Sequence, residues 1–145
     1  MTTDLLLAVA HHLFAFSLIA FLVAELVLLT ASPGRPVLRK LLFIDLCYGV
    51  AAVGSVVAGV SRLHWGDKPA EFYTGNPVFW IKMGLWVLVG LISIVPTIRY
   101  IIWIRRQELP SPAVFASTRR LVTLEVALFT GIPVFAAMMA RGVGY

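Results

Sequence analysis

Two adjacent histidines, His11 and His12, lie inside the apolar stretch LAVAHHLFAF, and Lys82 lies inside the apolar stretch FWIKMGLW. Ionisable side chains at membrane depth are costly and normally face a bundle interior or water, so each is a functional candidate. A neutral imidazole can coordinate iron or accept a hydrogen bond. If helices begin near Asp4 and Pro77, His11 and Lys82 both lie roughly 8–10 Å along their axes. They could therefore share one site.

The spacing of His11 from Glu25 indicates which histidine faces inward. Fourteen residues separate the two, which is two heptads and nearly the same helical face. Because Glu25 must avoid lipid, His11 should also face the interior, while His12 lies well off that stripe. A purely structural, hydrogen-bonded role for His11 is equally open. Lys82 has the alternative of extending its amine to the membrane interface.

A second polar layer lies toward the other ends of the apolar stretches. Its members are Glu25, Asp45, Arg99 and Glu125. We favour an internal ion-pair network that fixes how the helices align. In the alternative, the acids are buried titrating groups of a proton-coupled pathway, with Arg99 keeping one of them ionised.

The elements that must position these residues are transmembrane helices. The chain of 145 residues is 60% hydrophobic and only 13% charged, whereas soluble domains have about 25% charged residues. Its apolar residues form four blocks, approximately 4–30, 38–60, 77–104 and 114–140, each long enough to cross a bilayer. The links are short. The sequence therefore predicts an all-α fold, an integral membrane four-helix up-down-up-down bundle in a single domain, 1–145.

Basic residues at the ends of the blocks predict the orientation. The first and third links carry most of them: Arg35, Arg39, Lys40, Arg105, Arg106, Arg119 and Arg120. The second link is close to neutral. The positive-inside rule then places the first and third links in the cytoplasm and both termini in the periplasm of a bacterial inner membrane. The net charge of +5 is thus explained without nucleic acid as a partner.

The second block carries small residues at four-residue spacing: Ala51, Ser55 and Gly59, with Gly54 and Ala58 alongside. Such stripes let membrane helices approach closely. We expect this stripe to form a packing surface in the bundle or between copies, and we predict a homo-oligomer through this helix.

Among cofactors, the composition favours a haem. The sequence contains no nucleotide-binding loop and no cysteine pair, since Cys47 is the only cysteine. Histidines that project into a membrane helical bundle are a common way to hold haem b. His11 would be the metal ligand. The second axial ligand could be His64, Met139 or a residue of another subunit, although His64 is more typical of the interface and Met139 of packing.

Three stretches carry a resemblance to a known family: FIDLCYGVAAVGSVVAGVSR, KPAEFYTGNPVFWIKMGLWVLVGLISIVPTIRYIIW and LEVALFTGIPVFAAMMARGVGY. They resemble a family of small bacterial four-helix membrane proteins classified as a domain of unknown function. The resemblance covers nearly the whole chain. It implies a four-helix integral membrane protein and no established activity.

The placement of His11 and Lys82 is more distantly similar to HemJ-type protoporphyrinogen oxidases, which are four-helix membrane proteins associated with haem b. That resemblance implies catalytic and cofactor-binding roles for both residues. His11 would contact haem or porphyrin, and Lys82 would anchor a propionate or contact a porphyrin or quinone-like redox partner. The chain departs from those oxidases in the flanking residues and in the layer formed by Glu25, Asp45 and Glu125. The alternatives are a small proton-coupled transporter and a structural or accessory subunit.

Overall fold

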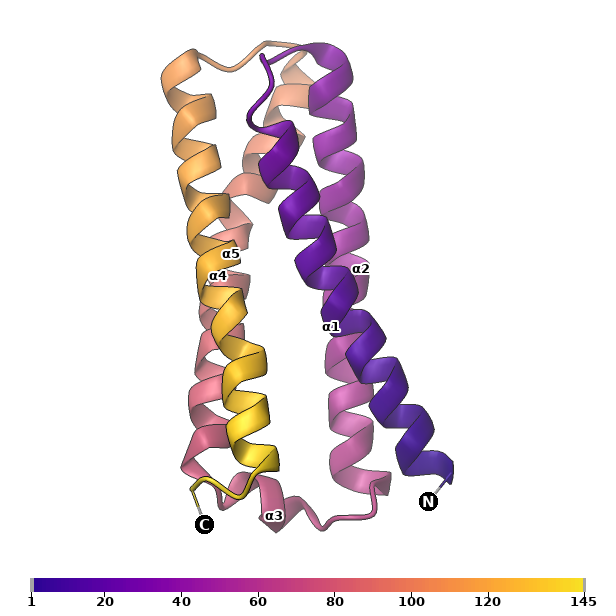
Figure 1. Ribbon diagram of the computed structural model, residues 1–145. Coiled ribbons are helices and arrows are strands. Elements are labelled where there is room, and N and C mark those ends of the chain that lie inside the picture. The colour runs from indigo at the N-terminus through magenta and orange to yellow at the C-terminus, as the bar shows by residue number, and fades with distance from the viewer. Residues whose placement is uncertain (1, 145) are drawn as a thin grey trace.

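The computed structural model describes residues 2–144, and they form four long helices and one short one (Figure 1). The long helices are α1 (Thr2–Leu28), α2 (Arg35–Trp65), α4 (Pro77–Arg106) and α5 (Pro112–Ala140), and the short one is α3 (Ala70–Thr74). All four long helices are long and apolar enough to cross a membrane. The predicted all-α membrane bundle is confirmed.

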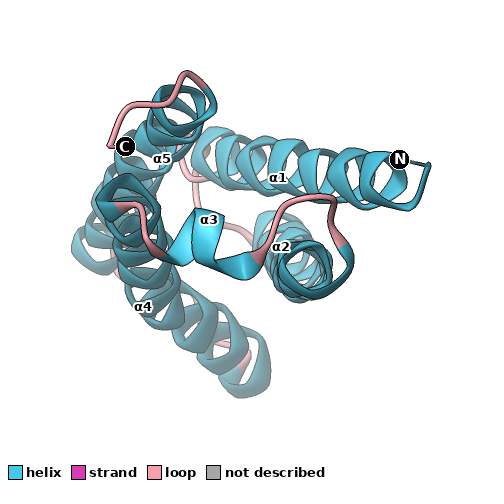
Figure 2. Cartoon of the chain, turned by 90° about the horizontal axis from the view of Figure 1, so that it is seen from below, coloured by secondary structure: helices cyan, strands magenta, loops and turns pink. Residues whose placement is uncertain are grey.

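The helices pack as two antiparallel hairpins (Figures 1 and 2). In the first hairpin α1 packs along α2, and in the second α4 packs along α5. Smaller contacts of α1 with α5 and of α2 with α4 close the bundle, which leaves α1 and α4 diagonally opposite. The two hairpin links lie at one end of the molecule, and α3 and both chain ends lie at the other (Figure 1).

The helix bounds differ from the predicted blocks mainly at α2, which extends from Arg35 to Trp65. It begins three residues before the predicted block, with Arg35 and Pro36; Pro36 suits the first turn of a helix because its missing N–H is not needed there. The second link, between α2 and α4, contains α3. After it, the Asn76 side chain caps α4 by accepting a 2.8 Å hydrogen bond from the Val78 backbone N–H.

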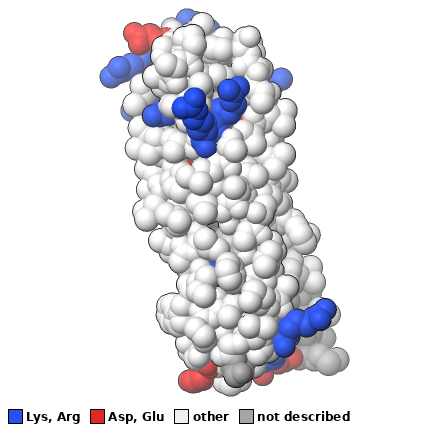
Figure 3. Space-filling model, turned by 60° about the vertical axis from the view of Figure 1, so that its left-hand side comes forward, with Lys and Arg blue, Asp and Glu red and all other residues white. Residues whose placement is uncertain are grey.

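Charged side chains gather toward the two ends of the molecule, and the middle of the visible face is almost free of them (Figure 3). Many large apolar side chains point outward at mid-height; Phe16 is 68% exposed and Val50 71% exposed. In water such a surface would be an aggregation hazard. It is the surface expected of helices solvated by lipid.

The small-residue stripe of α2 packs against α1 of the same chain. Ala51, Ser55 and Ala58 are buried. A Cβ atom added at Gly54 would lie only 2.5 Å from Cε1 of Phe14. Within the bundle this stripe is therefore covered by α1 of the same chain. The homo-oligomer through α2 stays a prediction.

Candidate functional site

His11 lies on the inner face of α1 and contacts α2. Its Nδ1 is 3.1 Å from the backbone carbonyl oxygen of Ser55. A carbonyl oxygen only accepts, so Nδ1 donates its proton and the neutral ring keeps its lone pair on Nε2. The ring packs beside Gly59, where an added Cβ would lie 3.4 Å from His11 Cε1. A histidine fixed through one nitrogen in this way is oriented to bind a ligand through the other.

The other two histidines are exposed and bond within their own helices. His12 Nδ1 lies 2.6 Å from the carbonyl oxygen of Ala8, and His64 Nδ1 lies 3.0 Å from that of Val60. Of the adjacent pair, His11 is thus the one that faces inward, as its spacing from Glu25 predicts. His64 does not join His11, because α2 turns it outward beside Trp65.

Lys82 and Arg62 place two further cationic side chains near His11. Both act electrostatically on the His11 ring, and Arg62 also acts on Lys82. Arg62 pairs with Asp4, at 3.5 Å between Nε and Oδ1. Lys82 is half-buried, with its Nζ 5.4 Å from the centre of the Phe79 ring. Within residues 2–144 it has no acidic partner within 4 Å.

The second polar layer contains three buried carboxyl groups, which we name the carboxyl cluster. Glu25 of α1 is 2% exposed, Asp45 of α2 is 6% exposed and Glu125 of α5 is 1% exposed. The three interact electrostatically with one another. Both hairpins therefore contribute to one acidic centre within the bundle.

The carboxyl cluster is only partly hydrogen-bonded. The Tyr100 hydroxyl donates to Oε2 of Glu25 at 3.1 Å, and the Thr97 hydroxyl donates to Oδ1 of Asp45 at 2.8 Å. Oε1 of Glu25 and Oε1 of Glu125 are buried and have no hydrogen-bond partner among residues 2–144. Such unsatisfied buried oxygens are uncommon in native structures and call for an explanation.

The hydrogen bonds of Arg99 lie outside the carboxyl cluster, and its place in a four-residue network with the acids stays a prediction. Its Nη1 donates to Ser117 Oγ at 2.8 Å and to Thr118 Oγ1 at 2.9 Å, both on α5. No ion pair joins it to an acid among the residues that the structure describes. Two hydroxyl groups on the neighbouring helix thus engage Nη1 of the guanidinium.

The hydroxyl groups around the carboxyl cluster were missed from the sequence. Ser93, Thr97 and Tyr100 follow one another at spacings of four and three residues, so they share one face of α4. Tyr48 of α2 lies beside Ser93 and interacts electrostatically with all three acids. A stripe of hydroxyl groups on one face of an otherwise apolar helix is a sequence pattern that predicts a polar face inside the bundle. In this structure Thr97 and Tyr100 of that stripe bond to the acids.

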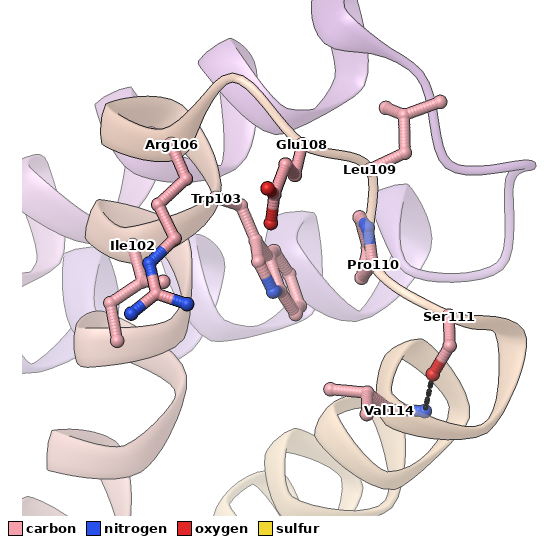
Figure 4. Close-up of a pocket in the computed structure, with 8 residues that line it drawn as sticks. All are labelled: Ile102, Trp103, Arg106, Glu108, Leu109, Pro110, Ser111 and Val114. Carbon is pink, nitrogen blue, oxygen red and sulfur yellow. Dashed lines mark hydrogen bonds between the residues drawn. The ribbon is translucent and has the colours of Figure 1, made fainter.

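Two surface hollows lie outside these sites. One, of about 230 Å³, is formed where α4 turns into α5 and is lined by Trp103, Arg106, Glu108 and their neighbours (Figure 4). The other is an apolar groove of about 370 Å³ between α1 and α2, lined among others by Phe14 and Cys47. Neither includes His11 or Lys82. Met139 is half-buried in the last turn of α5.

Comparison with known proteins gives one match. Residues 3–144 match the model of a family described as "Predicted membrane protein (DUF2214)". The match covers nearly the whole chain, so the chain belongs to this family. No curated protein and no solved structure matches it. The comparisons thus agree with the predicted membership of a four-helix membrane family and give no support to the HemJ resemblance.

Proposed function

We propose that this DUF2214 protein is a membrane redox protein that binds haem b or a related anionic porphyrin beside His11. The proposal rests on one observation: the Ser55 carbonyl fixes the His11 ring with Nε2 unused, beside the cationic groups of Lys82 and Arg62. A neutral imidazole nitrogen is a ligand for iron. The cationic groups of Lys82 and Arg62 would attract the carboxylates of a porphyrin.

The donor set fits such a group. His11 would bind the iron, and Lys82, which has no acidic partner within 4 Å among the described residues, would hold a propionate. Met139 of α5 or a residue of another subunit would be a second iron-binding group. Within residues 2–144 no group of three histidine, cysteine or acidic side chains could hold a metal ion, so the iron would depend on His11 and on a second ligand of another kind.

Bound haem would supply one-electron chemistry inside the bilayer. The protein's own residues would orient it, His11 through its fixed ring and Lys82 through its charge. A porphyrin or a quinone-like molecule in the membrane would be the redox partner. We place the protein in the bacterial inner membrane with both termini in the periplasm, on the basis of its basic links.

The absorbance spectrum of the protein tests this function. Protein purified in mild detergent from haem-replete cells is expected to have a Soret band that sharpens and shifts when dithionite reduces the iron. Extraction and quantification as the pyridine complex would give the haem content per chain. A colourless preparation that also takes up no added haem would reject the proposal.

A further inference from the structure

The carboxyl cluster has no part in haem binding as proposed, and it lies in a different polar layer of the bundle. Glu25, Asp45 and Glu125 come from three helices and both hairpins. We infer that these three carboxyl groups form a proton-binding site inside the bilayer, in which they hold protons in place of a compensating cation.

The first observation behind this inference is that no cationic side chain pairs with the carboxyl cluster in the described part of the chain. No lysine, arginine or histidine forms an ion pair with the cluster within residues 2–144, and the Arg99 guanidinium is engaged by Ser117 and Thr118. An ionised carboxylate buried without a partner costs several kcal/mol even after its surroundings relax. Three such charges close together would also repel one another. A proton on a carboxylate removes both costs.

The second observation is that two carboxyl oxygens of the cluster have no hydrogen-bond partner among the described residues. Oε1 of Glu25 and Oε1 of Glu125 are buried and unpaired, on side chains that are 2% and 1% exposed. An ionised carboxylate has only acceptors, whereas a protonated one has an O–H donor. A proton on either glutamate removes its charge and gives the cluster an O–H donor. The proton comes from a hydronium ion in the adjoining water, so one O–H bond breaks there and one forms on the carboxyl group for each charge that is lost.

The groups that face the cluster from every packed helix agree with this inference. Glu25 faces it from α1, Asp45 and Tyr48 from α2, Tyr100 from α4 and Glu125 from α5. The tyrosine hydroxyls are neutral hydrogen-bonding groups, and no histidine takes part. A divalent metal fits less well, because the acids do not converge into a group of three that could hold an ion among the described residues.

Infrared spectroscopy of the full-length protein in detergent tests the site directly. At pH 7 the wild-type protein is expected to have a carbonyl-stretch band of protonated carboxylic acids, which shifts in D₂O. Glu25→Gln and Glu125→Gln should each lower the intensity of this band, and the double variant should lower it further. Glu108→Gln is the matched control, because Glu108 is exposed in the α4–α5 link and should leave the band unchanged.

The possible outcomes separate this inference from the haem proposal. His11→Ala should keep the infrared band, whatever it does to haem. The inference is overturned if the wild-type protein lacks the band at pH 7, a result that does not depend on any variant folding. It is also overturned if sodium at constant pH replaces the band with carboxylate absorption, because the cluster would then be a cation site.

Discussion

The hydroxyl of Tyr100 donates a 3.1 Å hydrogen bond to Glu25, although their helices, α4 and α1, lie diagonally opposite in the bundle. Both side chains are almost completely buried. The backbones of α1 and α4 are not in contact, and the long tyrosine side chain bridges the space between them. This bond therefore joins the two hairpins through the middle of the carboxyl cluster.

Removal of that hydroxyl should weaken the bundle. Tyr100→Phe leaves Oε2 of Glu25 without its donor, and a buried acceptor left unpaired costs about 1–3 kcal/mol. We expect a loss of that size in the free energy of unfolding, measured by circular dichroism in mixed micelles with increasing SDS. Tyr73→Phe is the control, since the Tyr73 ring packs on Phe72 and Phe79 at the α3 end. Equal stability of the two variants would contradict the prediction.

The close approach of α1 and α2 should make Gly54 intolerant of a side chain. In Gly54→Ala the new methyl group would lie 2.5–2.7 Å from three atoms of the Phe14 ring. Overpacking of this kind costs about 1–3 kcal/mol, whereas alanine in an open helical position stabilises a helix relative to glycine. Gly49→Ala is the matched control on the same helix, because an added Cβ there has no neighbour within 4 Å. A Gly54→Ala protein whose melting temperature equals or exceeds that of Gly49→Ala would refute the packing argument.

The two adjacent histidines should respond differently to substitution. His11→Ala removes the ring that bonds to the Ser55 carbonyl and is expected to abolish the Soret band. His12→Phe changes an exposed ring that bonds only to its own helix, so the band should remain. The comparison is made on equal amounts of folded protein, judged by gel filtration. Loss of the band in His12→Phe alone would reverse the assignment of the inward face of α1.

The orientation in the membrane can be tested with single cysteines. In a Cys47→Ser background, Asp67→Cys in the α2–α3 link should react with a membrane-impermeant maleimide added to cells with a permeabilised outer membrane. Glu108→Cys in the α4–α5 link should react only after the inner membrane is opened. The expectation rests on the basic residues around the α1–α2 and α4–α5 links. The opposite labelling pattern would place both termini in the cytoplasm.

Hydropathy and spacing predicted the four helices and the inward side of α1, because both depend on which residues avoid lipid. The same reasoning could not place the partner of His11, since the acceptor is a backbone carbonyl of α2 that carries no sequence signal. It also grouped Arg99 with the acids by depth alone. The hydroxyls of Ser117 and Thr118 decide its position, and only the packing of α4 on α5 brings them within reach.

Both hydrogen bonds of the carboxyl cluster, from Tyr100 to Glu25 and from Thr97 to Asp45, run from the second hairpin to the first. The contacts within each hairpin are more extensive than those between them. The less extensive contacts between the hairpins form a seam, and the carboxyl cluster lies on that seam. Exposure of the acids to water would therefore require the loss of tertiary contacts between the hairpins and not of helical turns.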